Sequence, residues 1–295
     1  MKKLSILFVF LAGCLWGGFM GIFVRLLTDA GFSHMEIAFL RSVGTVLLFA
    51  PILLVRDRSL FRIRLKDVWC FAGTGIASIT FFNFCYFYAI EKTSLSVAAV
   101  LLYTSPIFVL TLSALFFHEP ITKQKLFALS LCLIGCTLVS GVFSEGRFTF
   151  LGILAGVGAG LGYALYSVFS RAALARGYQT LTVLFYTFLF SSVTTALFID
   201  VPHAVTLLAP SPRLWLLALL LSVVVTVAPY LFFTVGLNYI ENGTASIVAS
   251  VEPVAATLTG ILLYHEIPTG LEIFGILLVL TAIALLNLPK KETSQ

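Results

Sequence analysis

Charged residues are scarce in this chain of 295 residues: Asp, Glu, Lys and Arg together make up 11%, whereas soluble domains carry about 25%. Hydrophobic residues make up 60% of the chain, and its mean hydropathy is +1.07. A surface with so few charges cannot face water over the whole molecule. The apolar runs also lack the alternation of apolar and polar residues that marks the strands of a membrane barrel. The sequence therefore predicts an all-α, polytopic membrane protein.

Motifs of several other protein classes are missing as well. The chain contains no Walker motif, no GxSxG nucleophile elbow and no HExxH zinc motif. Its five cysteines lie inside apolar runs, where no histidine or acid completes a metal set. The net charge of +5 is distributed between the apolar runs and forms no continuous patch. We therefore expect no enzyme activity, no cofactor, no metal and no nucleic-acid partner.

Apolar runs of about 20 residues follow one another along the chain, which is the length that a transmembrane helix needs. Capping signals mark several of their starts, such as the box formed by Ser33 and Glu36. The length of the chain allows roughly ten such helices. The predicted spans are residues 4–27, 34–55, 68–90, 94–117, 120–142, 148–174, 180–199, 212–239, 242–266 and 269–288.

The first run has two interpretations. Two lysines followed by LSILFVFLAGC resemble a secretory signal, and residues 11–14 resemble a lipoprotein processing site. The apolar run nevertheless continues to Arg25, beyond the usual 7–15 residues of a signal sequence. We therefore expect this run to be retained as the first helix.

The chain contains two similar halves. Residues 98–119, AAVLLYTSPIFVLTLSALFFHE, and residues 245–266, ASIVASVEPVAATLTGILLYHE, share a central proline and a final His-Glu at a constant separation of 147. We expect one five-helix repeat over residues 1–145, a second over 148–290, and a tail at 291–295. Because five is odd, the two repeats should insert with opposite orientations, and inverted repeats place the substrate site near the midplane between them.

The basic residues predict the orientation of the chain. With the N-terminus inside, 13 of the 18 Lys and Arg residues lie on the cytoplasmic side, as the positive-inside rule requires. Both termini are then cytoplasmic. The thirteen are Lys2, Lys3, Arg56, Arg58, Arg62, Arg64, Lys66, Lys123, Lys125, Arg171, Arg176, Lys290 and Lys291.

Glu252 is the strongest candidate for a functional residue. Counted from a helix start near Asn242, it lies roughly 15 Å into a ~30 Å hydrocarbon core. A carboxylate there costs at least ~2.5 kcal/mol unless it is paired, protonated or in contact with water. We expect Glu252 to bind a cationic or zwitterionic substrate or to exchange a proton with it. The alternative is a structural acid that is bonded to a neighbouring helix.

Other polar and aromatic side chains are predicted to lie deep in the spans. Tyrosines and a tryptophan could surround an amine by cation–π contact, although ordinary packing between helices explains any single one of them. Arg41 has three open roles: attracting an anionic group, pairing with Glu252, or extending to the outer headgroups. The predicted substrate-binding residues are Trp16, Asn83, Tyr103, Tyr163, Tyr230 and Glu252, with Arg41 as a charge partner.

Several of these residues occur in an order that carries a family resemblance. Trp16-Gly17, Arg41, Pro106 with residues 118–122 (HEPIT), and Glu252-Pro253 with residues 265–266 (HE) resemble the drug/metabolite transporter superfamily, EamA type. The resemblance extends over nearly the whole chain. It implies a ten-helix fold with a central cavity and a role in moving small metabolites, often outward.

Together these observations predict a secondary transporter in the cell membrane that exports small polar metabolites, such as amino acids or amines, by alternating access. Uptake of a small cationic amine is the alternative within transport. An intramembrane enzyme would instead need two reactive polar groups within hydrogen-bond reach in a cavity. A membrane assembly protein would have a solid interface between the halves. A coupling proton and a homodimer are both compatible with the sequence.

Overall fold

The computed structural model describes residues 2–142, 149–265 and 267–287, and within these ranges every regular element is a helix. The elements are α1 (Lys2–Asp29), α2 (His34–Arg56), η1 (Arg58–Phe61), η2 (Leu65–Asp67), α3 (Val68–Ala72), η3 (Gly73–Thr80), α4 (Phe81–Lys92), α5 (Leu95–Leu102), α6 (Ser105–Phe117), α7 (Lys123–Val139), α8 (Phe150–Ala175), α9 (Thr180–Ala196), α10 (Val201–Leu208), α11 (Pro212–Leu220), η4 (Leu221–Val227), α12 (Ala228–Leu237), α13 (Asn242–Ala249), α14 (Glu252–Tyr264) and α15 (Gly270–Asn287).

The structure confirms an all-helical, multi-pass membrane protein. Among the described residues, seven helical segments are long and apolar enough to cross a membrane, and the α9–α10 pair, bent by 106°, would make an eighth. Helix α15 is apolar but shorter. The count of ten spans stays a prediction, as do the exact limits of the repeats. Residues 143–148, which hold the predicted division between the halves, and the tail at 291–295 lie outside the described ranges.

Predicted caps are confirmed at several helix starts. Ser33 and Glu36 form the full capping box, with the Glu36 side chain accepting a hydrogen bond from the backbone of Ser33 at 2.7 Å. Thr122 accepts from the backbone N–H of Lys125 at the start of α7. These side chains satisfy N–H groups that a helix leaves unpaired in its first turn, so they fix where each helix begins.

The two halves repeat each other in backbone detail. The first half has a helix break between Leu102, where α5 ends, and Ser105, where α6 begins. The second half has the same break 147 residues later, between the end of α13 at Ala249 and the start of α14 at Glu252. A proline occupies the first turn of α6 and of α14, where a missing N–H costs no hydrogen bond. His118 and His265 end these helices with the same left-handed conformation, φ 54° and ψ 31°. The π-helical segments η3 and η4 also fall at equivalent positions.

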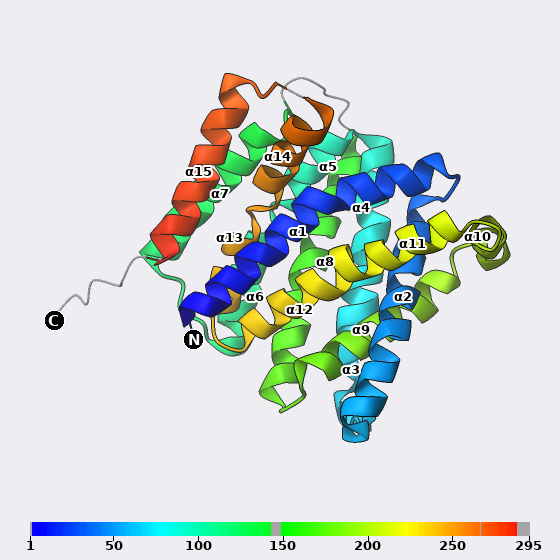
Figure 1. The fold of residues 1–295 in the computed structure, drawn as a ribbon. Coiled ribbons are helices and arrows are strands. Elements are labelled where there is room, and N and C mark those ends of the chain that lie inside the picture. Colours follow the sequence, from blue (N-terminus) through cyan, green and yellow to red (C-terminus); the bar gives the residue numbers. More distant parts are fainter. Residues whose placement is uncertain (1, 143–148, 266, 288–295) are drawn as a thin grey trace.

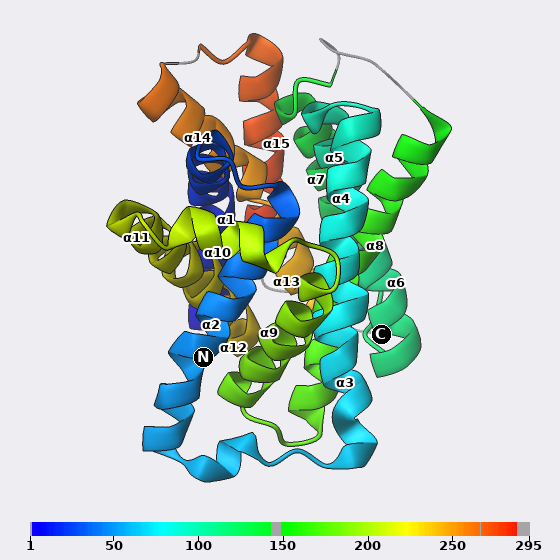
Figure 2. The ribbon, with the colours of Figure 1, turned by 90° about the vertical axis from the view of Figure 1, so that its right-hand side faces the viewer.

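The repeats are inverted and interlocked. Helices α1 and α8, which begin the two halves, run in opposite directions through the bundle (Figures 1 and 2). Each packs on the broken helix of the other half, α1 on α13 and α14, and α8 on α5 and α6. Helices α7 and α15 form a further pair at one side of the molecule (Figure 1). The interior between the halves is therefore bounded by both broken helices.

Glycines permit the close approach of these helices. On α8, a Cβ at Gly156 or Gly160 would meet α5 or the turn after it, and one at Gly158 or Gly162 would meet α4. The alternate glycines thus form two contact faces on one helix, as the spacing of four residues predicts. On α1, a Cβ at Gly17 would lie 1.9 Å from the carbonyl oxygen of Glu252, so only glycine fits there.

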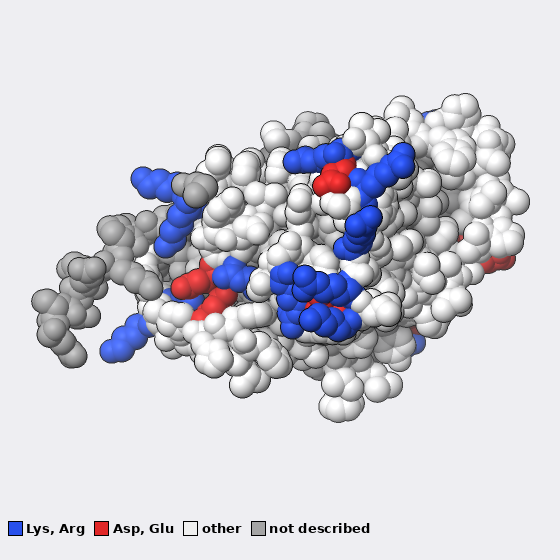
Figure 3. Space-filling view, turned by 90° about the horizontal axis from the view of Figure 1, so that it is seen from below, with Lys and Arg blue, Asp and Glu red and all other residues white. Residues whose placement is uncertain are grey.

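One end of the bundle is strongly basic. We call it the basic end and define it by the turns between α2 and α3, α6 and α7, α8 and α9, and α12 and α13, which lie low in Figure 1. Viewed from this end, Lys and Arg side chains gather on the surface with acidic side chains among them (Figure 3). The opposite end carries the turns between α1 and α2, α4 and α5, and α14 and α15 (Figure 1).

Candidate substrate site

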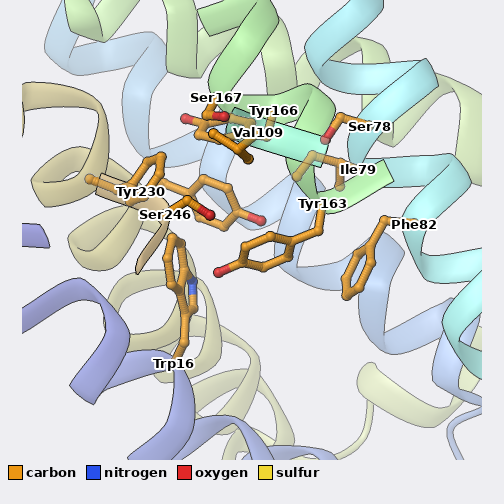
Figure 4. A pocket seen from close by; sticks show the side chains of 11 residues that line it. Trp16, Ser78, Ile79, Phe82, Val109, Tyr163, Tyr166, Ser167, Tyr230 and Ser246 are labelled. Carbon is orange, nitrogen blue, oxygen red and sulfur yellow. The ribbon is translucent and has the colours of Figure 1, made fainter. Parts of the chain in front are cut away.

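A cavity lies between the two halves. Helix α1, η3, α4 and α6 of the first half and α8, α12 and α13 of the second half contribute to its wall. Its lining residues are Trp16, Ser78, Ile79, Phe82, Val109, Tyr163, Tyr166, Ser167, Tyr230, Phe233 and Ser246 (Figure 4).

Aromatic rings form much of this wall. The ring centroid of Trp16 lies 5.0 Å from that of Tyr230, 5.7 Å from that of Phe233 and 6.2 Å from that of Tyr163. The Tyr163 side chain reaches across the cavity toward Trp16 (Figure 4). Trp16 meets Tyr163 and Tyr230 edge to face, at interplanar angles of 70° and 76°, which is a favourable arrangement for aromatic rings. The wall of the cavity is therefore largely aromatic.

A second, smaller cavity adjoins the first, because Tyr163 and Ser246 line both. It lies at the two helix breaks and contains the acid. Its lining residues are Leu102, Tyr103, Ser105, Tyr163, Ser246, Ala249, Ser250 and Glu252.

Glu252 is the first residue of α14, immediately after the break. The Tyr163 hydroxyl donates a hydrogen bond to its Oε2 at 3.4 Å. Partial positive charge at the start of α14 also favours a carboxylate there. Among the ion pairs of the described residues, none involves Glu252. Glu252 is thus a cavity-lining acid whose carboxyl group has no cationic partner in the described part of the chain.

Arg41 and Asn83 form no ion pair or hydrogen bond with this acid. Arg41 is 3% exposed, and its Nη2 donates to Oδ1 of Asn83 at 3.4 Å. Asn83 in turn donates to the carbonyl oxygen of Ile79 at 2.7 Å, and it is not among the residues that line either cavity. The ion pairs found in the described ranges do not join Arg41 to Glu252. Arg41 is buried rather than extended to the headgroup region.

The cavities bring together five of the six predicted binding residues, namely Trp16, Tyr103, Tyr163, Tyr230 and Glu252. Sequence reasoning missed Ser246, which lines both cavities from α13. Its signal was weak, because a single serine in an apolar helix usually bonds to its own backbone. Whether these residues bind substrate stays a prediction.

The Tyr163–Glu252 pair also bears on the enzyme alternative. Two polar groups do stand within hydrogen-bond reach, but catalysis by a nucleophile needs an adjacent base that is held in place by a third group. In the described part of the cavity wall, Tyr166 bonds to Thr234 at 2.6 Å and thus contributes to packing. The pair is better suited to binding than to bond cleavage.

The fold and the cavity define a polytopic helical membrane protein with two inverted repeats and a site between them. The model of the EamA-like transporter family matches residues 3–141 and again residues 150–288. The chain belongs to this family, within the drug/metabolite transporter superfamily, and it is a membrane transporter.

Individual proteins show the same likeness. An uncharacterized transporter of Archaeoglobus fulgidus is 31% identical over 210 residues, which are 71% of this chain and 73% of that protein. The pseudopaline exporter CntI of Pseudomonas aeruginosa is 30% identical over 263 residues, which are 87% of each protein. A crystal structure with 20% identity matches 97% of both chains at a TM-score of 0.76 and shares the fold.

Proposed function

We propose that this transporter exports small polar metabolites, with amino acids and related amines as the leading class, by alternating access between its two halves. The observation that carries the proposal is the position of Glu252. Its carboxylate lines a cavity between the halves, next to an aromatic wall, and no cation neutralises it in the described ranges. A protonated amine would supply the missing charge while its carbon chain packs on the rings.

The cost of burying the carboxylate supports coupling to a proton. A buried ion without a partner costs several kcal/mol, so Glu252 must hold a proton or a cation whenever the site is closed to water on both sides. A substrate ammonium and a proton compete for the same carboxylate. Export of the amine would then exchange it for an incoming proton.

The direction and the setting are part of the proposal. A relative named as an exporter covers 87% of this chain, which supports outward transport. The concentration of Lys and Arg at the basic end supports a cytoplasmic location for that end in the cell membrane. A cavity lined by both halves also favours transport over a purely structural role, which would call for a solid interface.

The test is flux into and out of reconstituted vesicles. Purified protein would first be screened by ligand-induced thermal shift across amino acids, amines and sugars, because a ligand at 100 times its Kd stabilises the folded protein by about 2.7 kcal/mol. Flux of the best ligand would then be compared in wild type, Glu252→Gln and Glu91→Gln. Glu91 is the matched control, since it is an acid 68% exposed at its side chain and paired with Lys92.

We expect Glu252→Gln to remain folded and to lose flux at least about tenfold, because a hydrogen bond to a charged group contributes about 1.5–3 kcal/mol. Glu91→Gln should transport like wild type. Wild-type flux in Glu252→Gln would remove Glu252 from the mechanism. Net movement of amine only toward the side of the basic end would indicate uptake rather than export.

A further inference from the structure

At the basic end, a carboxylate of the first half caps a helix of the second half. Glu119 follows α6 and reaches the start of α13, where its Oε1 accepts a hydrogen bond from the backbone N–H of Asn242 at 2.9 Å and its Oε2 accepts one from Gly243 at 3.3 Å. A carboxylate at a helix start satisfies unpaired N–H groups and interacts favourably with the helix dipole. Glu119 therefore caps a helix that is 123 residues away in the chain and belongs to the other repeat.

Two basic side chains complete this contact, which we call the Glu119 cluster (Glu119, Lys125, Arg171 and Glu241). Arg171 of α8 lies 3.8 Å from Glu119, and its Nη1 donates to the carbonyl oxygens of Leu237 and Ile240 after α12. Lys125 of α7 pairs with Glu241 at 2.6 Å. Both halves thus contribute charge to one cluster, directly below the broken helix.

The cluster is largely removed from water. Glu119 is 8% exposed and Lys125 is 4% exposed. Removing one partner from a buried charge network leaves the other charges without compensation, which is strongly unfavourable. Separating the halves at this end would break these contacts together.

The equivalent position at the opposite end differs. Asn242 corresponds to Leu95 in the repeat, yet Asn242 is fully buried and Leu95 is 62% exposed. In the described ranges, the side chain that caps α5 is its own Ser94, which accepts from Val97 at 3.2 Å. Among the described residues, no side chain of the other half caps α5 in the way that Glu119 caps α13. The start of α13 is thus buried, whereas the start of α5 is exposed.

We propose that Glu119 is a positioning residue of the transport cycle, which holds α13 against the first half and thereby keeps the basic end of the cavity closed. Helix α13 is joined to α14 by only Ser250 and Val251, so α13 can move as a short rigid piece relative to the helix that carries Glu252. Loss of the Glu119 cap would release α13 and favour the state that is open at the basic end. This inference rests on the proposed alternating access and not on the identity of the substrate.

Two introduced cysteines, one at each end of the bundle, measure how accessible that end is to a polar thiol reagent. Ser113→Cys lies on α6 beneath the cluster, where Ser113 is fully buried and its carbonyl oxygen accepts the backbone N–H of Glu119. Leu95→Cys reports on the opposite end. Purified full-length protein would be treated with a polar thiol reagent, and labelling of each reporter would be followed by mass spectrometry of its peptide.

We expect Glu119→Gln to speed labelling at position 113 about tenfold or more and to slow labelling at position 95. Glu119→Asp should restore much of the wild-type pattern, because it keeps the charge. Glu91→Gln is the matched control and should change neither rate. Glu241→Gln removes only the surface acid of the cluster and should change both labelling rates in the same direction by a smaller factor. If Glu119→Gln does not fold, the Glu241→Gln variant still tests the proposal.

Unchanged labelling of both reporters in Glu119→Gln and Glu241→Gln would overturn the proposal. Faster labelling at position 113 without slower labelling at position 95 would also overturn it, since local fraying alone would do that. The flux of Glu252→Gln separates this failure from failure of the proposed function, because the labelling experiment requires no substrate.

Discussion

The two broken helices, α5–α6 and α13–α14, share one backbone plan and differ in their chemistry. Both break at equivalent residues and resume with a proline in the first turn. At the first residue of the second piece, however, one carries Ser105 and the other Glu252. At the first residue of the first piece, one presents an exposed leucine and the other a buried asparagine under Glu119. The comparison teaches that duplication provided a symmetric frame and that a few unmatched side chains decide which broken helix carries the cavity acid and which one begins at a buried residue.

The largest expected difference between the two halves is a difference in stability, and it arises at the contact between α1 and α14. Gly17→Ala would place a Cβ 1.9 Å from the Glu252 carbonyl oxygen, and neither backbone can move freely. We expect a loss of stability at or above the upper end of the ~1–3 kcal/mol typical of overpacking. Its counterpart on α8 is the buried Ala164, so Ala164→Gly is the control and should cost about 1 kcal/mol through helix propensity. Thermal midpoints in detergent measure both, and equal midpoints would contradict the asymmetry.

A smaller difference is expected one helical turn earlier. A Cβ at Gly13 would lie 2.6 Å from the Ala249 carbonyl oxygen, whereas one at Gly160 would meet the Thr104 hydroxyl at 2.7 Å. A side chain can rotate away and a backbone carbonyl cannot. Gly13→Ala should therefore cost ~1–3 kcal/mol and Gly160→Ala less.

A double variant sharpens this prediction. Removing the hydroxyl with Thr104→Ala should recover part of the stability lost in Gly160→Ala. Greater destabilisation by Gly160→Ala than by Gly13→Ala, in the same thermal measurement, would count against the argument.

The next largest expected effect concerns substrate affinity at the candidate substrate site. Tyr163 corresponds to Trp16 in the repeat, and its hydroxyl is hydrogen-bonded to Glu252. Tyr163→Phe should raise the KM for an amine substrate a few-fold, since a neutral hydrogen bond contributes ~0.5–1.5 kcal/mol. Tyr166→Phe is the control, because its hydroxyl bonds to Thr234 instead. Equal KM values in the two variants would show that the Tyr163 hydroxyl does not act through Glu252.

The smallest effect lies at the starts of α2 and α9. Glu36 in α2 accepts a hydrogen bond from His203 of α10 at 2.7 Å, whereas the equivalent of Glu36 in α9 is the buried Val183. Helix α10 lies outside the seven long spans, and the hydrogen bond to Glu36 raises the pKa of His203. The stabilisation is complete below the ordinary histidine pKa of about 6.5 and is lost as pH rises through the raised value.

The corresponding measurement is a thermal midpoint in wild type and His203→Gln at acidic and alkaline pH. Wild type should be the more stable at acidic pH, and the difference should shrink as the pH rises. A difference that stays constant with pH would show that the charge of His203 contributes nothing.

Much of the fold could be predicted because its signals are local or repeated. The capping box at Ser33 needs only four consecutive residues, and the helix breaks follow from prolines in a duplicated pattern. Five of the predicted site residues line the cavities because residues deep in a span of a duplicated bundle face the seam between the halves. Asn83 does not, since its amide is taken by Arg41 and Ile79. The sequence gives no way to choose between a cavity and a neighbouring helix for such a side chain.

Glu119 shows most clearly that the sequence does not identify the partner of a buried polar side chain. Its sequence position predicts only that it lies at the end of a helix, whereas in the structure its partners are N–H groups of another helix. Glu266, its counterpart in the second half, lies outside the described residues.

Composition, periodicity and duplication by themselves determined that this chain is a helical membrane protein of two inverted halves, because these properties depend on short-range sequence and on the thickness of a bilayer. Only the tertiary structure decided which side chains share the cavity, that Arg41 and Glu252 form no ion pair, and that Glu119 caps a helix of the other half. Those outcomes depend on contacts between residues more than a hundred positions apart, whose geometry is set by helix packing and not by any local pattern.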